Sequence, residues 1–557
     1  MGQALRAGRR PAHAPSARPG ARPRPGGPSR SGAHPSRKPA QPVRREPRGF
    51  VPVAADEVPG DIHALAPAEG NPALAACRAT AEALSAYAAQ HPGPEAADWA
   101  FVAQERVTEC TYRIDEGAGQ DELQGLADAA RGELAALTLG LLDEAGPMTA
   151  ERLAALDADT LALLTWYAAP WPVRWLWPPE TDAHGVALRP RIVNLFHGPG
   201  GWSEGICRVL GADVDMIGVD LDPGAAATAN AAGHVCIVAD VAALDPEHPA
   251  LQWVVGVILS PPCQAFSPAG RRRGHEVAAI ELVCSVIRSV GGAAGYLQTV
   301  HADGSGAGCA PRSGETWPEV RAQLAGLEDE RAGLMAEAAI WPLAMLCSNG
   351  SVEWVAVEQS SALPAEIEEA IFFEFEQAGW RTTEAMTLDS VEHGSPSHRK
   401  RRFLTAYRNQ TPVISVHPET PFPVTTFAQC VGWGPGRRVN TRGQRGIDPR
   451  TGRPKGGGGF SADRPSNCVT ATAYGWKDED SGQRIHQNDI GRLVGFRSDY
   501  PWTHIGRGEG IRTRAQQAAD VVCPMTAAAV IGRILNLHWE EQTRTYVTKL
   551  YGTTETA

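Results

Sequence analysis

Short apolar runs alternate with helix-like segments from Arg189 onward, and this alternation restricts the fold more than any other feature of the sequence. The runs are Ile192–Phe196, Met216–Val219, Val235–Val238, Val254–Leu259 and Trp354–Val357. Strands that alternate with helices form a parallel sheet, because each helix carries the chain back to begin the next strand. The sequence therefore predicts an α/β fold in which helices cover both faces of the sheet.

Composition divides the 557 residues into five expected regions. They are a disordered basic Pro/Arg-rich arm over 1–60, a helical region over 61–180, an α/β domain over 181–410, a small Gly-, Pro- and Arg-rich module over 411–485, and a C-terminal segment over 486–557 that returns to the α/β domain. The arm lacks the apolar residues whose burial would offset the entropy of ordering. The helical region has Ala and Leu at helical spacing in 79–90 and 123–142. It ends in tryptophans whose density is typical of packing between parts of one protein: Trp166, Trp171, Trp175 and Trp177.

The overall charge does not exclude a nucleic-acid partner. The net charge is −11, from 52 Lys and Arg against 63 Asp and Glu. Screening limits the reach of each charge to about 10 Å, so a local basic surface can bind DNA on an acidic protein. Eleven cysteines without a CxxC pair predict reduced thiols in a cytoplasm and no zinc site. The sequence has no apolar run of the length of a membrane helix, so we expect no membrane partner.

A glycine-rich turn, Phe196–Gly201, follows the first apolar run and precedes a helix-like segment. Glycines at such a place let backbone amides approach a ligand closely. Asp220 ends the next run, where an acid binds ribose hydroxyls, and Asp240 ends the third run, where it could meet an adenine amino group. Each glycine alone could simply make a tight turn, but together these features predict an adenosine-type pocket. We expect it to be lined by Phe196, Gly198, Gly200, Gly201, Asp220, Leu221, Asp240, Val241 and Pro262.

The run Val254–Leu259 leads into Ser-Pro-Pro-Cys-Gln-Ala-Phe-Ser-Pro-Ala-Gly, in which the cysteine is Cys263. This segment resembles the nucleophile motif of the cytosine-5 DNA methyltransferase family, which is Pro-Cys-Gln followed by Phe-Ser and a glycine. The resemblance implies a Rossmann-like fold that uses S-adenosylmethionine, with a smaller target-recognition domain added. It also implies that Cys263 is the nucleophile. Only a thiolate attacks C6 of cytosine, so the site must lower the pKa of Cys263 or remove its proton.

Two further motifs imply the other catalytic residues. The segment after Trp354–Val357 begins with Glu358, where the family has Glu-Asn-Val, and the resemblance implies that Glu358 binds the N3 and amino edge of the target cytosine. A later segment matches Pro-Gln-x-Arg-x-Arg through Arg399 and Arg401. The resemblance implies that Arg401 faces the cytosine carbonyl oxygen and that Arg399 supports the site. The chain departs from these motifs at Gln359 and Ser397.

Basic residues in two places are expected to contact DNA. One group surrounds the nucleophile, and the other lies in the small module, where glycines and arginines are dense. These residues are Gln264, Ser267, Arg271, Arg272, Arg273, Arg437, Arg438, Arg442 and Arg445. The arginines of the module could instead belong to a disordered basic linker.

The end of the chain completes the resemblance, which spans residues 189–537. It contains segments similar to the family's Arg-Pro-x-x-Thr, Arg-Leu-x-Gly-Phe and Gln-x-Gly-Asn-x-Val motifs, the last with Ala519 and Asp520 in place of Gly-Asn. Because that element packs against the cofactor pocket in the family, the departure leaves the donor affinity open.

The whole pattern predicts a DNA (cytosine-5-)-methyltransferase that methylates C5 of a cytosine flipped out of duplex DNA. Cytosine-5 methylation of RNA is an alternative, as is a non-catalytic DNA-binding protein that kept the fold. We expect a monomer that binds duplex DNA and S-adenosylmethionine but no metal, in the cytoplasm of a bacterial or phage-infected cell. A cognate restriction endonuclease is a further partner that such an enzyme could have.

Overall fold

The computed structural model describes residues 71–267, 273–294, 298–300, 307–309, 315–348, 351–409, 411–441, 458–486, 488–503 and 511–552. The chain divides into two units, residues 1–62 and 63–557. The described ranges all belong to the second unit, so the basic arm expected over residues 1–60 lies outside them.

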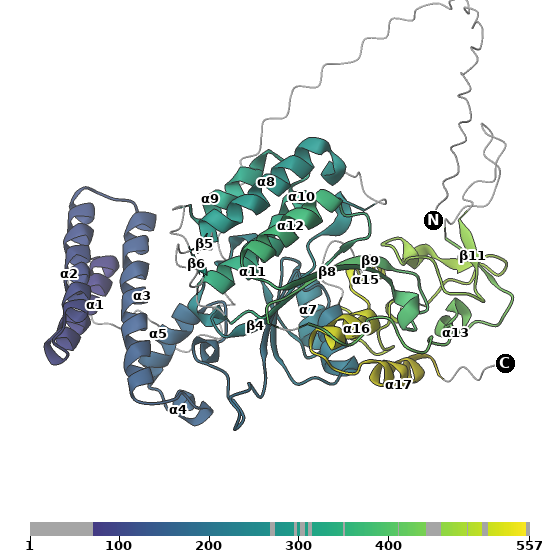
Figure 1. The fold of residues 1–557 in the computed structure, drawn as a ribbon, viewed down its shortest axis with the longest axis horizontal. Coiled ribbons are helices and arrows are strands. Elements are labelled where there is room, and N and C mark those ends of the chain that lie inside the picture. Colours follow the sequence, from purple (N-terminus) through teal and green to yellow (C-terminus); the bar gives the residue numbers. More distant parts are fainter. Residues whose placement is uncertain are drawn as a thin grey trace, which may run out of the picture. The chain divides into compact units, whose positions relative to one another are not determined.

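A seven-stranded sheet with the order β3-β2-β1-β4-β7-β9-β8 forms the centre of the second unit (Figure 1). Its strands are β1 Arg191–Leu195, β2 Asp215–Asp220, β3 Val235–Val238, β4 Val254–Leu259, β7 Trp354–Ser360, β8 Thr382–Asp389 and β9 Lys400–Tyr407. The five runs that the sequence indicated all form strands, and these five pair in parallel. The predicted α/β fold is therefore confirmed.

One strand differs from the expected parallel arrangement: β9 pairs antiparallel with both β7 and β8, so β8 runs in the same direction as β7. A parallel neighbour needs a crossover connection of about a dozen residues or more, usually a helix. Only a short segment containing the 3₁₀ turn Ser390–His393 joins β8 to β9, so the chain reverses direction there.

Helices cover both faces of the sheet, and Figure 1 shows α8, α11 and α12 grouped together on one side of it. The helices associated with the sheet are α6 Gly201–Glu204, α7 Pro223–Ala231, α8 Val277–Ala294, α9 Trp317–Ala322, α10 Glu330–Gly333, α11 Glu337–Cys347, α12 Ala365–Gln377 and α16 Pro524–Ile534. Within the described ranges, no helix is long and apolar enough to cross a membrane.

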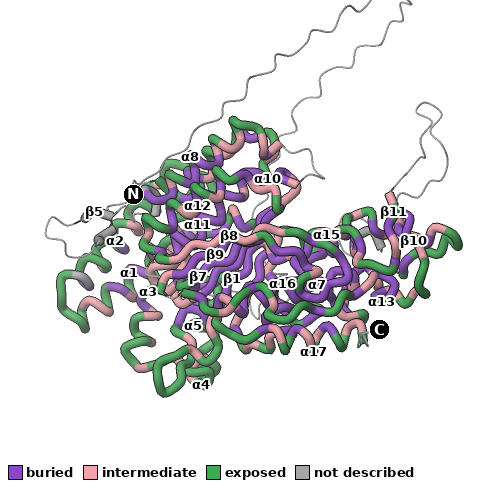
Figure 2. The backbone as a smooth tube through the Cα atoms, turned by 45° about the vertical axis from the view of Figure 1, so that its right-hand side comes forward, coloured by how far each residue is buried: buried purple, intermediate pink, exposed green. Residues whose placement is uncertain are grey.

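Neighbouring residues on the central strands point into different cores. Val193 and Val257 belong to the core with α8, α11 and α12, whereas the adjacent Ile192 and Ile258 belong to the core with α6 and α16. Successive side chains of a strand point to opposite faces, so continuous apolar runs are what a sheet covered on both sides requires. Burying each such side chain contributes about 1.5–3 kcal/mol. Figure 2 shows the central strands as a continuous buried region.

The N-terminal part of the second unit is helical, as the sequence predicted. Its helices are α1 Pro72–Gln90, α2 Pro94–Asp115, α3 Gln120–Glu144, α4 Ala150–Ala154 and α5 Ala158–Ala168. Cys77 of α1, Cys110 of α2 and Leu123 of α3 share a small apolar core. The α1 helix begins where the side chain of Asn71 accepts a hydrogen bond from the amide of Ala73 at 2.9 Å, and such a cap stabilises a helix by about 1 kcal/mol.

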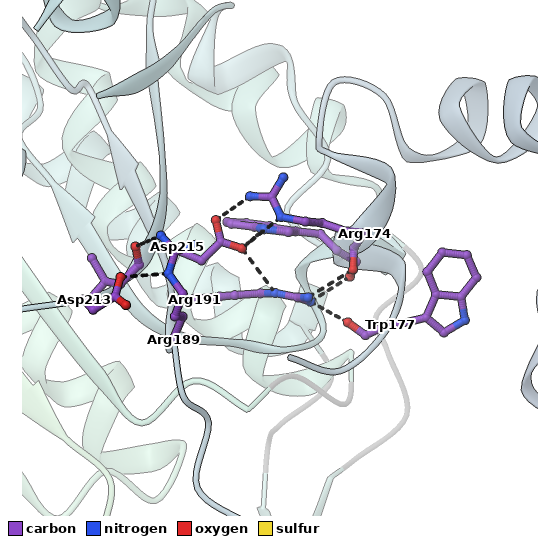
Figure 3. A network of polar contacts seen from close by, with 8 residues as sticks. Arg174, Trp177, Arg189, Arg191, Asp213 and Asp215 are labelled. Atoms are coloured by element: carbon purple, nitrogen blue, oxygen red, sulfur yellow. Dashed lines mark hydrogen bonds and ion pairs between the residues drawn. The ribbon is translucent and has the colours of Figure 1, made fainter. Parts of the chain in front are cut away.

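The tryptophan segment joins these helices to the sheet. Trp171, Trp175 and Trp177 are buried in the main core, which confirms the expected packing, whereas Trp166 is 36% exposed. At the start of β1, Arg191 donates hydrogen bonds to the carbonyl oxygens of Trp177 at 2.6 Å and Trp175 at 3.2 Å. Figure 3 shows the Arg191 guanidinium between these carbonyls and Asp215. Burial lowers the pKa of Arg191 to about 10, so this arginine stays charged near neutral pH and holds the segment in place.

A small three-stranded sheet of order β11-β10-β12 lies in the expected module. The remaining elements are β5 Gln298–Val300, β6 Ala307–Cys309, α13 Phe427–Val431, β10 Arg438–Asn440, β11 Gly459–Ser461, β12 Lys477–Asp478, α14 Asp489–Leu493, α15 Ile511–Asp520 and α17 Glu540–Tyr551. Phe427, Phe460 and Trp476 of the module share one core with Phe496 and Val521 of the C-terminal segment. The bounds of the five expected regions stay predictions.

Candidate functional site

The carboxyl ends of the parallel strands bring the expected site residues to one edge of the sheet. In the register of the sheet, Leu195 at the end of β1 pairs with Val219 of β2 and with Leu259 of β4. Leu259 in turn pairs with Val357 of β7. The segments that follow these strands therefore start side by side, although they are far apart in the sequence. Ligands of α/β proteins bind at this edge.

The glycine-rich turn after β1 has an unusual backbone and borders open space. Phe196, Gly198 and Gly200 have positive φ angles of 57°, 61° and 105°, a conformation that glycine adopts readily. A Cβ placed on Gly198 would meet nothing within 4 Å. A Cβ placed on Gly201 would lie 2.2 Å from the carbonyl oxygen of Val522. The first glycine thus leaves room for a ligand, and the last lets the C-terminal segment approach closely.

Asp220 ties this turn to β2. Its Oδ2 accepts a hydrogen bond from the Gly198 amide at 2.6 Å, and its Oδ1 accepts one from the Asp222 amide at 2.8 Å. Burial raises the pKa of Asp220. A carboxylate has about four acceptor positions, so Asp220 keeps capacity to accept hydrogen bonds from ribose hydroxyls.

The other residues expected in the adenosine pocket surround the same edge. Leu221 is 66% exposed and Val241 is buried. Asp240 is exposed, and its carboxylate accepts a hydrogen bond from the Ala242 amide at 3.0 Å. Pro262 is half-buried. Free carboxylate oxygens, exposed apolar surface and the space beside Gly198 fit a nucleoside, and the role of each residue remains a prediction.

Cys263 lies in a 3₁₀ turn, Cys263–Ala265, directly after β4. Buried hydrogen bonds hold the segment between the strand and this turn. Trp202 donates to the Ser260 hydroxyl at 2.9 Å, and Gln359 donates to the carbonyl oxygen of Pro261 at 3.2 Å. Gln359 departs from the family motif, yet its longer side chain supports the loop that carries Cys263.

Glu358 lies on β7, Arg401 on β9, and Arg399 immediately before β9. Arg401 of β9 pairs in register with Ser360 of β7 and is therefore a diagonal neighbour of Glu358 on the same face. Its Nε lies 2.7 Å from Oε1 of Glu358, as an ion pair rather than an aligned hydrogen bond. Arg399 is buried and donates to the carbonyl oxygen of Ala519 at 2.7 Å. The sheet thus brings the expected acid and the two arginines together.

The loop before β9 is held by residues on both sides. Asp389, at the end of β8, accepts hydrogen bonds from the Arg399 amide at 3.0 Å and from the His398 ring at 2.9 Å. The hydroxyl of Ser397, the second departure from the family motif, donates to the carbonyl oxygen of Leu493 at 2.6 Å. The substitution therefore keeps a buried hydrogen bond at this position.

Charges from all of these groups act on Cys263. Burial raises the pKa of its thiol; the charge of Arg401 lowers it, that of Glu358 raises it, and smaller effects come from Arg399 and Asp520. The net effect is a raised pKa, so the chain by itself does not lower the pKa of Cys263.

The raised pKa predicts how alkylation of Cys263 depends on pH. A free cysteine has a pKa of about 8.5 and reacts as the thiolate. We expect the rate for Cys263 to be lower than that of a free cysteine at pH 7, and to keep rising with pH beyond the midpoint of a free cysteine. The measurement is the rate of iodoacetamide labelling of the Cys263 peptide, followed by mass spectrometry at several pH values.

Two variants control this experiment. Arg401→Leu removes a positive charge and should slow labelling at fixed pH, whereas Glu358→Gln removes a negative charge and should accelerate it. Labelling of Cys263 that is already at its maximum rate at pH 7 would contradict the raised pKa.

The residues expected to contact DNA have different surroundings. The side-chain amide of Gln264 donates to Asp520 at 3.4 Å, and the backbone amide of Ser267 donates to the carbonyl oxygen of Cys263 at 2.9 Å. Arg273 forms ion pairs with Glu276 at 2.6 Å and Glu328 at 2.9 Å. Contact of these residues with DNA stays a prediction.

In the small module, Arg437 and Arg438 lie at the start of β10. Arg437 donates to Gln483 at 3.1 Å and stacks on the Trp433 ring, while Arg438 pairs with Glu479 at 3.2 Å. The other expected DNA contacts, Arg271, Arg272, Arg442 and Arg445, lie outside the residues that the structure describes.

Sequence reasoning missed Arg331, which precedes the helix leading to β7. It donates from Nε and Nη2 to both carboxyl oxygens of Asp329 at 2.8 Å. The pKa of Arg331 is raised, chiefly by Asp329, with a smaller contribution from Cys263, so Arg331 and Cys263 interact electrostatically. The signal available in the sequence was an arginine directly after three consecutive acids, residues 328–330.

Residues 190–292 match the family model of the C-5 cytosine-specific DNA methylase. The match contains the glycine turn and the nucleophile motif, and it confirms the resemblance found from the motifs. No curated protein matches the chain.

Solved structures with a similar fold include three methyltransferases, each covering 62% of this chain. The Entamoeba histolytica methyltransferase EhMeth is 11% identical, has a TM-score of 0.41 and is covered over 98% of its length. The S. pombe Dnmt2 methyltransferase is 14% identical, with a TM-score of 0.40 and 99% coverage. A putative DNA modification methyltransferase encoded within an E. coli prophage is 16% identical, with a TM-score of 0.36 and 99% coverage.

Proposed function

We propose that this chain transfers a methyl group to C5 of a cytosine in duplex DNA, because residues 190–292 match the family model of the C-5 cytosine-specific DNA methylase. One observation carries the proposal. The loop after β4 places Cys263 where the charges of Glu358, Arg399 and Arg401 act on its thiol, at the same edge of the sheet as the glycine turn and Asp220.

C5 and C6 of cytosine are inaccessible within the base stack, so the base must leave the duplex, at a cost of about a few kcal/mol. The Cys263 sulfur then adds to C6, and the ring electrons move toward N3 and onto C5. Glu358 holds the N3 and amino edge, and Arg401 holds the carbonyl oxygen, so the charge that develops on the ring is neutralised. Loss of the C5 proton and release of the thiolate from C6 complete the turnover.

Gly198, Gly200, Asp220 and Asp240 would hold S-adenosylmethionine, which supplies the electrophilic methyl group that C5 takes up. The protein side chains do not supply the methyl group but prepare the base to accept it. Cys263 makes C5 nucleophilic, and Glu358 and Arg401 orient the base.

The ion pair between Glu358 and Arg401 restricts which base can enter the site. These two side chains face each other at 2.7 Å, and both are expected to bind the cytosine edge. An incoming base must therefore replace their direct contact with its own amino group and carbonyl oxygen. Cytosine presents a donor to the acid and an acceptor to the arginine, so each charged group exchanges its ionic partner for a neutral hydrogen-bonding partner.

Methyl incorporation from tritiated S-adenosylmethionine tests the function. We expect incorporation into duplex DNA and none into transfer RNA, because the arginines of the module beside the site are suited to phosphates and base edges. Bisulfite sequencing of DNA from cells that express the chain should then show methylated cytosines in one sequence context. Incorporation into transfer RNA alone would give the RNA alternative, and incorporation into neither would favour a binding protein without catalysis.

The same proposal places the protein with duplex DNA in a cytoplasm. A cognate restriction endonuclease remains a prediction, and its test is whether DNA methylated by this chain resists an endonuclease from the same system.

A further inference from the structure

The C-terminal end of α15 brings an acid, Asp520, next to the nucleophile turn. Gln264, the residue after Cys263, donates from its side-chain amide to Oδ1 of Asp520 at 3.4 Å. Gln516, one helical turn earlier, donates to Oδ2 at 2.5 Å. Both carboxyl oxygens therefore accept hydrogen bonds from neutral amides, and the side chain remains exposed to solvent.

The charge of Asp520 acts on both halves of the proposed site. It raises the pKa of Cys263, which follows β4, and that of Asp220, which ends β2. In the sheet, β1 lies between β2 and β4. Asp520 therefore lies close to the space between Asp220 and Cys263. A ligand that extends from Asp220 toward Cys263 must pass near this carboxylate.

Burial raises the pKa of Asp520, and hydrogen bonds from Gln516 and Gln264 and the charge of Arg399 oppose part of that rise. Donors to a carboxylate favour its ionised form. The last carbonyl groups of α15, a helix of ten residues, add partial negative charge at the same place. A cation is therefore favoured beside Asp520.

We propose that Asp520 is a specificity-determining residue that favours the cationic methyl donor over its neutral product. The inference rests on the proposed function. S-adenosylmethionine carries a positive sulfonium, whereas S-adenosylhomocysteine has an uncharged thioether in its place, and the two share every other charged group. A carboxylate near the sulfur thus stabilises only the donor, and after transfer it no longer attracts the product.

The test compares the dissociation constants of both ligands by calorimetry in the wild-type protein and in Asp520→Asn. We expect the preference for the donor to fall about three- to tenfold in the variant, the size expected for removing one charge several ångströms from another in partly solvated surroundings. The Cys263 thiol should also be labelled faster by iodoacetamide in Asp520→Asn, a readout that a merely structural change would not give.

Three controls accompany the test. Asp520→Glu restores the charge and should restore the preference, whereas Asp520→Ser should reproduce the loss. Asp213→Asn removes an exposed acid that precedes β2 at the opposite edge of the sheet, and it should leave the preference unchanged. In the wild-type protein the preference should also decrease as salt is raised, which keeps the inference testable if a variant unfolds.

The outcomes separate the inference from the proposed function. An unchanged ratio of dissociation constants in Asp520→Asn and Asp520→Ser, together with a salt-independent ratio in the wild type, overturns the role of Asp520 alone. Failure of the wild-type protein to bind either ligand overturns the proposed function instead.

Discussion

Replacing Cys263 by alanine should lower methyl transfer by about 10⁴-fold or more while leaving the binding of S-adenosylmethionine intact. The reason is chemical: C5 of cytosine is too weak a nucleophile to take up a methyl group until a thiolate has added to C6. The side chain of Cys263 is small and half-buried in a surface turn, so its truncation should cost little stability. Tritiated methyl incorporation gives the rate, and calorimetry gives the donor affinity.

Cys468 offers a matched control for this experiment. It is also half-buried, and it contributes electrostatically to the pKa values of Arg399 and Arg401. Unlike Cys263, it does not lie in the loop that follows a parallel strand. Cys468→Ala should keep most of the activity. Duplex DNA containing 5-fluorocytosine should form a covalent complex with the wild-type protein and with Cys468→Ala, but not with Cys263→Ala. Undiminished transfer by Cys263→Ala would exclude the mechanism.

Replacing Glu358 by glutamine should reduce kcat by about 10²- to 10⁴-fold, the range for a positioned acid or base. Glutamine keeps the shape of the side chain but cannot supply a charge or a proton to N3 of the base. The change also leaves Arg401, whose side chain is 15% exposed, without its carboxylate. Removing one partner of a buried pair costs on the order of 3 kcal/mol, so the variant should unfold at a lower denaturant concentration.

A neighbouring ion pair separates the loss of activity from the loss of stability. Arg402, the next residue of β9, pairs with Glu368 of α12 at 2.7 Å, away from Cys263. Glu368→Gln therefore removes a similar contact on the same strand. We expect it to lower stability in denaturant titrations without a comparable fall in kcat. Equal kinetic effects of Glu358→Gln and Glu368→Gln would mean that Glu358 acts only through the fold.

The strands and the nucleophile could be predicted because their signals are local. An apolar run of a few residues between turn residues is sufficient to indicate a buried strand, and four of the five runs agree with the observed strands to within a residue at each end. The motif around Cys263 is also contiguous. The antiparallel return of β9 was not predicted, because strand direction depends on the length and path of the connection rather than on the strand itself.

The supporting contacts could not be predicted from the same sequence. Gln359 and Ser397 differ from the family motifs, and nothing next to them in the chain shows that they hold Pro261 and Leu493. The pKa of Cys263 also depends on four charged groups from three separate segments. Whether the pKa of Cys263 rises or falls can be found only when the positions of these groups in space are known, since burial and charges of both signs act on the thiol together.

By itself, the sequence determined the α/β class and predicted Cys263 as the nucleophile, with the acid and arginines expected around it, because each is encoded by a short periodic or contiguous pattern. The tertiary structure alone decided that Arg401 pairs with Glu358, that Gln359 supports the nucleophile loop, and that Asp520 lies beside Gln264. Gln264 and Asp520 are 256 residues apart in the chain. Only the packing of α15 against the carboxyl edge of the sheet brings these two side chains within reach of each other.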